Sequence, residues 1–214
     1  MSFPKPSLKP RKSAVQARSA VTVEALHQAT IQVLIQQGLV RCTTTRVAER
    51  AGISVGSVYQ YYPNRDALLA AVLEKHLERF AQTVEQTCAR HQGMPVVEMA
   101  AGLVSAMVAA KLRDQGISKA LYAIAGERGG AELVARVNTR VVAVIAEMLA
   151  TAADAHFDDP HLTAAISFSA IAGPVRTLLE GNASPAFEAG LEQQTTLLLT
   201  AYLQTHQHVL SSKE

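Results

Sequence analysis

The 214-residue chain has no tryptophan, only two cysteines and only 5% aromatic residues, although 49% of its residues are hydrophobic. A secreted, disulfide-stapled domain uses more cysteines in a shorter chain, so we expect Cys42 and Cys88 to be free thiols in a reducing compartment. No segment shows the alternating pattern of a β-strand. An Ala-, Leu- and Val-rich composition without that pattern predicts an all-α fold.

The chain also lacks a long apolar run and the motifs of catalytic or metal sites. No stretch approaches the roughly 20 apolar residues that span a bilayer, and the first residues, MSFPKPSLKPRKS, lack the apolar core of a signal peptide. The histidines and aspartates near His156 and His206 do not have zinc-site spacing, and no phosphate-binding loop or nucleophile elbow is present. We therefore expect a cytoplasmic protein with no membrane association, cofactor, metal or enzymatic activity.

Charge is scarce overall and unevenly distributed. Charged residues make up 18% of the chain, and the net charge is only +2. Residues 1–66 nevertheless hold nine basic and three acidic side chains, a net charge of +6, so the rest of the chain carries −4. This asymmetry favours a polyanion as the partner of the N-terminal third, although a chance excess on a solvated face would look the same.

Hydrophobic spacing divides the chain into about nine helices that follow a basic arm. Residues 1–19 combine three prolines with Lys and Arg and predict a flexible arm, and order is expected from about Thr22. Apolar residues that recur every three or four positions, bounded by Gly, Pro and capping residues, predict the helices. Their expected ranges are 22–37, 44–51, 55–62, 65–91, 96–113, 118–125, 131–155, 160–180 and 184–210.

Two short helices joined by a tight turn lie between residues 43 and 62. Thr43 is the expected N-cap of the first and Ser54 of the second, and Gly52 lies in the turn between them. Val58 and Tyr62 are four residues apart and would face the core. A longer helix followed by two such helices is typical of a helix-turn-helix unit. We assign this unit to residues 20–66 and a second helical domain to residues 67–214.

The segment TTTRVAERAGISVGSVYQYYPNRDALL, residues 43–69, closely resembles the DNA-binding signature of the tetracycline-repressor (TetR) family. The order of elements from Thr22 to Leu69 follows that family, whereas beyond Leu69 the resemblance is only architectural. The resemblance implies a homodimeric, ligand-responsive repressor that binds double-stranded operator DNA. Val55 stands where lysine is frequent in the family and Tyr61 where histidine is frequent, so a backbone contact could be absent at the first position and altered at the second.

A recognition helix needs small residues and a few polar side chains that reach the base edges, because it must enter a major groove about 12 Å wide. Gly56 and Ser57 would allow close approach, Gln60 can pair with adenine, and Val55 can contact a thymine methyl group. The other candidate DNA-binding residues are expected to contact phosphates: Thr43, Thr45, Arg46, Tyr59, Tyr61 and Arg65. For the two tyrosines, this role is what the family resemblance implies. The ring of Tyr59 could equally pack against the first helix.

The resemblance further implies that the C-terminal domain binds a small effector and dimerises through its last two helices. Residues 160–180 are rich in small side chains and residues 184–210 in leucine, which suits a helical interface, although a monomeric core would look similar. The scarcity of charge within these helices favours an apolar effector. The candidate effector-binding residues, which could also be plain core, are Met99, Leu103, Met107, Leu121 and Tyr122.

Two other functions stay open on the sequence alone. The C-terminal domain could bind a protein partner instead of a small molecule, with DNA binding retained. The chain could also be an all-helical enzyme or carrier, which the lack of catalytic motifs disfavours. The sequence specifies neither the effector, nor the operator, nor whether the ligand releases or promotes DNA binding.

Overall fold

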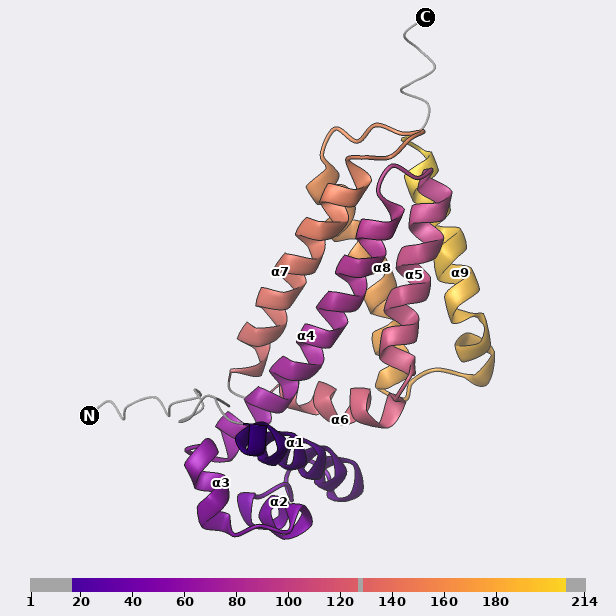
Figure 1. The fold of residues 1–214 in the computed structure, drawn as a ribbon. Coiled ribbons are helices and arrows are strands. Elements are labelled where there is room, and N and C mark those ends of the chain that lie inside the picture. The colour runs from indigo at the N-terminus through magenta and orange to yellow at the C-terminus, as the bar shows by residue number, and fades with distance from the viewer. Residues whose placement is uncertain (1–16, 127–128, 207–214) are drawn as a thin grey trace, which may run out of the picture. The chain divides into compact units, whose positions relative to one another are not determined.

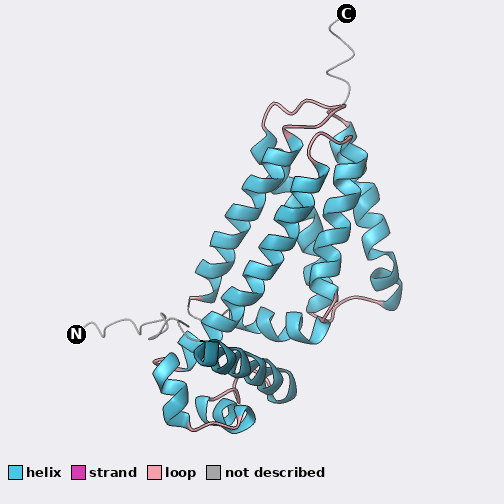
Figure 2. Cartoon of the chain, in the orientation of Figure 1, coloured by secondary structure: helices cyan, strands magenta, loops and turns pink. Residues whose placement is uncertain are grey.

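A computed structural model describes residues 17–126 and 129–206, and every regular element in these ranges is a helix (Figures 1 and 2). This confirms the all-α class that the composition predicts. The helices in the described ranges are α1 (Ala17–Gln37), α2 (Thr44–Ala51), α3 (Val55–Tyr61), α4 (Arg65–His91), α5 (Val96–Leu112), α6 (Gln115–Ala125), α7 (Gly130–Leu149), α8 (Pro160–Leu179) and α9 (Pro185–Gln204).

Several helix limits differ from the sequence expectation by more than one residue, among them the end of α9, which lies at Gln204 instead of residue 210. Helix α1 is already formed at Ala17, the first described residue, which lies inside the range assigned to the basic arm. Helix α6 begins at Gln115 rather than at residue 118. The arm residues 1–16, and residues 207–210 at the expected end of the last helix, lie outside the described residues.

Helix α7 also ends early, at Leu149 instead of residue 155. The residues that follow accept hydrogen bonds from backbone N–H groups of the turn between α4 and α5. The Thr151 hydroxyl accepts a hydrogen bond from the Gly93 N–H at 2.8 Å, and the Asp154 carboxylate accepts one from the Val96 N–H at 2.9 Å. The second bond serves an N–H at the start of α5, where no intrahelical partner exists. This segment therefore forms a cap for another helix.

The chain folds into two compact units, Met1–Leu77 with Gly116–Val134, and Glu78–Gln115 with Ala135–Glu214. Helix α4 contributes to both, because it runs without interruption past the boundary that we expect after Asp66. In the first unit α2 packs against α1 and α3, and Leu26, Val47 and Val58 are almost fully buried. These contacts form the small core behind α3.

In the second unit α5 packs along α9, and α8 packs against both of them (Figure 1). Helix α8 is long and apolar enough to cross a membrane by length and composition alone, with a mean hydropathy of 1.4. The sequence analysis considered unbroken apolar runs, and α8 is not one, because His, Thr, Ser and Arg residues interrupt it. Seven of the 20 residues of α8 are buried within the protein, and a buried core helix passes the same length and hydropathy criterion. Packing against α5 and α9 accounts for the buried part of its apolar composition.

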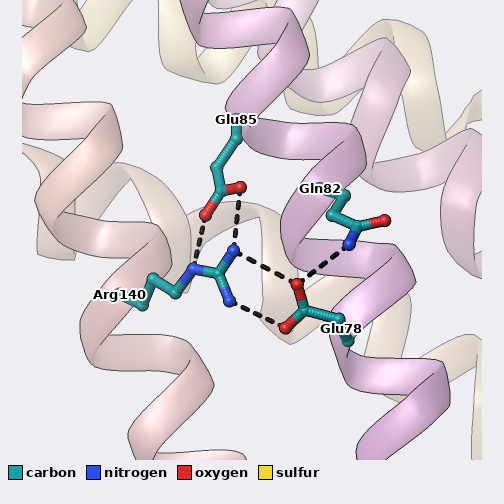
Figure 3. A network of polar contacts seen from close by, with 4 residues as sticks. All are labelled: Glu78, Gln82, Glu85 and Arg140. Carbon is teal, nitrogen blue, oxygen red and sulfur yellow. Dashed lines mark hydrogen bonds and ion pairs between the residues drawn. The ribbon is translucent and has the colours of Figure 1, made fainter. Parts of the chain in front are cut away.

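A charged network joins α7 to α4 within the second unit (Figure 3). Arg140 on α7 donates from Nε to Glu85 at 2.5 Å and from an Nη atom to Glu78 at 2.7 Å, and its second Nη atom bonds both carboxylates. Gln82 also donates to Glu78, at 3.0 Å. The hydrogen bonds from Arg140 and Gln82 lower the pKa of Glu78. One guanidinium thus holds two carboxylates that are seven residues, about two turns, apart on α4.

Candidate nucleic-acid interface

The N-terminus of α2 is capped by the side chain of the preceding residue. The Thr43 hydroxyl accepts a hydrogen bond from the Arg46 N–H at 3.3 Å, which confirms Thr43 as the N-cap. Thr43 and Thr45 are both exposed, whereas Thr44 between them is buried. Because the dipole and the free N–H groups of a helix N-terminus favour anions, this end of α2 suits a phosphate.

The turn between α2 and α3 depends on Gly52, which has a φ of +68°. Its N–H bonds the carbonyls of Ala48 and Glu49. A residue with a Cβ is strained in this left-handed region, which is why glycine ends α2. Two residues later Ser54 accepts a hydrogen bond from the Ser57 N–H at 3.1 Å and caps α3. The turn and both caps therefore agree with the sequence prediction.

Helix α3 presents its small and polar residues outward. Gly56, Tyr59 and Gln60 are exposed, and Val55, Ser57 and Tyr61 are partly exposed. The Tyr59 hydroxyl lies 3.3 Å from the Thr44 hydroxyl on α2, and its side chain is 43% exposed. Tyr59 thus contacts α2 through its hydroxyl while its ring is partly accessible.

The opposite face of α3 is anchored by residues that we predict as core. Val58 is fully buried and Tyr62 is 2% exposed. The Tyr62 hydroxyl lies 2.7 Å from Nε2 of His27 on α1, and burial raises the pKa of Tyr62 to about 12. The sequence analysis did not single out His27. Its only signal was its place three residues before Thr30 and seven before Leu34 on the buried face of α1.

Arg65 lies in a different environment from the one expected of a phosphate ligand. Its Nε donates to the Cys42 carbonyl and one Nη atom to the Leu39 carbonyl, both at 2.6 Å, and the other Nη atom is 3.5 Å from Asp66. These bonds tie the start of α4 to the turn that precedes Thr43. We therefore interpret Arg65 as a residue that positions the N-terminus of α2.

Arg46 also makes an internal contact, because its Nη1 donates to the Arg41 carbonyl at 3.2 Å. The Arg46 side chain is partly exposed and retains donors beyond this bond. Arg41 itself is exposed in the same turn and carries a positive charge beside Thr43. The sequence analysis counted Arg41 in the basic excess but did not place it in the site.

The candidate effector residues are divided between the two compact units. Met99, Leu103 and Met107 are buried on α5 in the second unit. Leu121 is buried and Tyr122 is 38% exposed on α6 in the first unit. The α5 residues share one helical face, since they are four residues apart. Their role in ligand binding remains a prediction.

Helices α8 and α9 expose apolar side chains in the second unit. Leu162 and Ile166 on α8, and Leu197 and Leu198 on α9, are between 44% and 57% exposed. Ser169 and Gly173 are exposed and continue the row of Leu162 and Ile166 at helical spacing. We call these six residues the α8–α9 face. By contrast, Ala164 and Ser167 are buried inside the unit and do not contribute to it.

Comparison with known proteins supports the interpretation of both regions. Residues 26–72 match the family described as bacterial regulatory proteins, tetR family, and residues 95–203, over half of the chain, match the tetracyclin repressor-like C-terminal domain. An uncharacterized HTH-type transcriptional regulator of Mycobacterium bovis is 29% identical over 126 residues, which cover 52% of this chain and 64% of the relative. The match thus spans less than two thirds of that relative's length.

Two solved structures share the fold. Salmonella enterica GusR superposes with a TM-score of 0.65 at 18% identity, over 90% of this chain and 100% of its own. The fatty acid degradation regulator FadR from Bacillus halodurans gives a TM-score of 0.65 at 18% identity, over 83% of this chain and 97% of its own. Motif geometry, family match and fold agree, and the chain belongs to the TetR family of DNA-binding transcriptional regulators, a family without enzymatic activity.

Proposed function

We propose that the protein is a cytoplasmic, homodimeric repressor that binds operator DNA through α3 and is released by a small, largely apolar effector. The observation that carries the proposal is the outward face of α3, where Gly56, Tyr59 and Gln60 are exposed on a helix capped by Ser54 and backed by buried Val58. Small and polar groups on a rigid helix are what major-groove reading needs.

In this proposal residues 20–66 form the DNA-binding domain and residues 67–214 the effector-binding and dimerisation domain. Gly56 and Ser57 allow close approach, Gln60 contacts a base, and Val55 contacts a thymine methyl group. Thr43, Thr45, Arg46, Tyr59 and Tyr61 hold phosphates that fix the helix in the groove. Arg65 supports this set indirectly, through its hydrogen bonds to the turn before Thr43.

Dimerisation is assigned to the α8–α9 face. Its four large apolar side chains are 44% to 57% exposed in the single chain. Helices α8 and α9 pack against each other, and exposed apolar side chains on two neighbouring helices favour an interaction site. An isologous contact would bury the same face on both copies. Two recognition helices related by a two-fold axis can then bind half-sites about one helical turn of DNA apart.

The effector site is assigned to the buried residues of α5, Met99, Leu103 and Met107, with Leu121 and Tyr122 on α6 as further candidates. FadR of Bacillus halodurans is a regulator of fatty acid degradation, and another protein of similar fold, EbrR, is a multidrug binding protein whose structure contains imidazole. The small-molecule binding of EbrR supports a small-molecule effector here.

The test is a selection of duplexes from a random DNA pool by the purified full-length chain, followed by fluorescence anisotropy. We expect one enriched sequence whose binding weakens as salt increases, because phosphate contacts release counterions. Gln60→Ala should lower affinity for the enriched duplex about five- to hundredfold, which corresponds to about 1–3 kcal/mol for a bidentate base contact. Gln86→Ala, an exposed glutamine on α4, is the matched control.

If no sequence is enriched, or if Gln60→Ala and Gln86→Ala bind equally well, α3 does not read DNA and the proposal is wrong. Repression itself is tested by in vitro transcription from a promoter that carries the enriched sequence. Transcription should fall when the protein is added. An increase would identify an activator.

A further inference from the structure

The turn between α1 and α2, residues 38–42, is closed by its own backbone. Gly38 follows α1 with a φ of +77°, a left-handed conformation that favours glycine. The Cys42 N–H donates to the Leu39 carbonyl at 3.1 Å, and the Cys42 side chain is only 1% exposed. The turn therefore ends on a buried side chain that anchors it to the first unit.

Two arginines hold the same turn from α2 and α4. Arg65 at the start of α4 donates to the carbonyls of Leu39 and Cys42, both at 2.6 Å. Arg46 on α2 donates to the Arg41 carbonyl at 3.2 Å. Hydrogen bonds from a charged donor are stronger than those between neutral groups. The backbone of the turn is thus held in place by guanidinium groups of two other helices.

The side chains of Val40 and Arg41 project from this turn. Val40 is 93% exposed, and Arg41 is also exposed. Arg46, Arg50 and Arg65 each donate a hydrogen bond to an oxygen of the protein. By contrast, within the part of the chain that the structure describes, the guanidinium of Arg41 forms no hydrogen bond or ion pair. A fixed turn directly before α2 therefore presents an unpaired positive charge to the solvent.

We propose that Arg41 contacts a phosphate of the operator, and that the turn of residues 38–42 is a preformed part of the DNA interface. This inference rests on the proposed function and extends the contact surface beyond α2 and α3. In a helix-turn-helix protein the first helix of the motif crosses the DNA backbone, so a residue just before α2 lies beside phosphates. A guanidinium can bond a phosphate through two N–H groups at once.

The internal bonds of Arg46 and Arg65 give the turn its value for binding. Because these bonds fix the backbone of the turn before DNA arrives, less conformational entropy is lost when Arg41 binds. A phosphate contact carries no sequence information of its own. Loss of this contact should therefore weaken binding to every duplex by the same factor and reduce the dependence of binding on salt.

The experiment is fluorescence anisotropy over a range of NaCl concentrations, with the full-length protein and two duplexes: the selected one and a copy with one unfavourable base pair. Arg41→Gln removes the charge and keeps the carbonyl that Arg46 binds. Arg41→Lys keeps the charge. Arg50→Gln is the matched control, because Arg50 is an exposed arginine at the opposite end of α2. Circular dichroism and urea denaturation verify that each variant is folded and as stable as the wild type.

We expect Arg41→Gln to weaken binding at about 0.1 M salt by about five- to tenfold for each copy of the chain on the duplex. The slope of log affinity against log salt should become shallower by about 0.9 for each copy, because one counterion fewer is released. Both duplexes should lose the same factor. Arg41→Lys should keep the wild-type slope, and Arg50→Gln should bind as the wild type does.

Ethylation interference locates the contact directly. Ethylation of one phosphate in each half-site should weaken binding of the wild type and have no effect on Arg41→Gln. The inference is overturned if Arg41→Gln keeps the wild-type affinity and salt slope, or if Arg50→Gln loses as much affinity. It is also overturned if the loss differs between the two duplexes, because Arg41 would then read bases.

The wild type distinguishes this failure from a failure of the proposed function. If the wild type binds the selected duplex and Arg41→Gln binds it equally well, only the Arg41 contact is wrong. If the wild type selects no duplex, the proposed function is wrong and the Arg41 contact with it.

Discussion

At Gly56, folding and DNA binding favour different residues. A Cβ at this position would meet only the Ser54 hydroxyl oxygen, at an ordinary contact distance of 3.7 Å. Within a helix, alanine is favoured over glycine by about 1 kcal/mol. We therefore expect Gly56→Ala to raise the midpoint of thermal unfolding slightly and to lower operator affinity, because the methyl group keeps the backbone of α3 away from the base edges. Differential scanning fluorimetry and anisotropy measure the two effects.

A matched substitution supports the interpretation of that result. Gly190→Ala on α9 adds a methyl group at another helical glycine, outside the α8–α9 face, where the new Cβ would meet only the Gln194 side chain at an ordinary contact distance of 3.8 Å. It should stabilise the chain to a similar extent without a direct effect at the DNA. Operator affinity that is unchanged in Gly56→Ala would contradict close approach at this glycine.

For Arg65, measurements of stability and of DNA binding distinguish a positioning role from a direct phosphate contact. Its guanidinium donates to two carbonyls, of Cys42 and Leu39, in a fork that a lysine cannot reproduce. Arg65→Lys should therefore lower the free energy of unfolding by about 1–3 kcal/mol. Urea denaturation measures this change, and Arg41→Lys, at an exposed site in the same turn, is the control. A normal unfolding midpoint combined with weak DNA binding would instead favour a direct phosphate contact.

At the residue scale, the sequence predicts the role of a residue where the local backbone geometry restricts the residue type. Thr43, Gly52 and Ser54 are readable because caps and left-handed turns restrict residue type. The bonds of Arg65 to Leu39 and Cys42, and of His27 to Tyr62, join residues 23 to 35 positions apart. Helical periodicity does not identify such pairs, because they depend on how the helices pack.

At the scale of elements, the network of Arg140 with Glu78 and Glu85 joins α7 to α4. The hydrogen bond from Arg140 is the main cause of the lowered pKa of Glu78, below its ordinary value of 4.5. A lowered carboxylate pKa stabilises the folded state above the ordinary value, and this contribution is lost as the pH falls through the lowered pKa. The network should thus stabilise the fold at neutral pH and not in acid.

We expect Arg140→Met to lower the midpoint of thermal unfolding at pH 7. The difference from the wild type should shrink below about pH 4.5, and also in about 1 M NaCl, because the partners are partly exposed and are screened by salt. Scanning calorimetry at several pH values measures the difference. Arg79→Met, an exposed arginine on α4, is the control. A difference that persists unchanged in acid would mean that Arg140 acts through packing of its stem.

Helix positions followed from periodicity, but their ends depended on tertiary contacts. The apolar spacing of α7 continues toward residue 155, yet the helix stops at Leu149, since Thr151 and Asp154 bond the turn before α5. In α8, Thr and Ser residues interrupt the apolar run, although the mean hydropathy of the helix meets the length and composition criterion for spanning a membrane. Sequence spacing alone cannot show which distant backbone groups a segment will cap.

At the scale of the whole molecule, the proposed dimer predicts that substitutions that prevent dimerisation also weaken DNA binding. Leu197→Glu with Leu198→Glu places two charges on the α8–α9 face, where burying them in an interface is costly. We expect a monomer by light scattering and a weaker complex with the operator. Val97→Glu, at a residue 42% exposed on α5, is the matched control and should stay dimeric. A doubly substituted protein that is still dimeric would place the interface elsewhere.

The most direct test of the central claim is methylation interference at guanine N7, an atom that lies in the major groove. The selected operator is methylated, bound to the full-length protein, and the free and bound fractions are cleaved and compared. The account predicts interference at two patches about 10 base pairs apart, one for each recognition helix, or at a multiple of that spacing. Interference confined to one patch, or absent from the major groove, would contradict DNA reading by a dimer through α3.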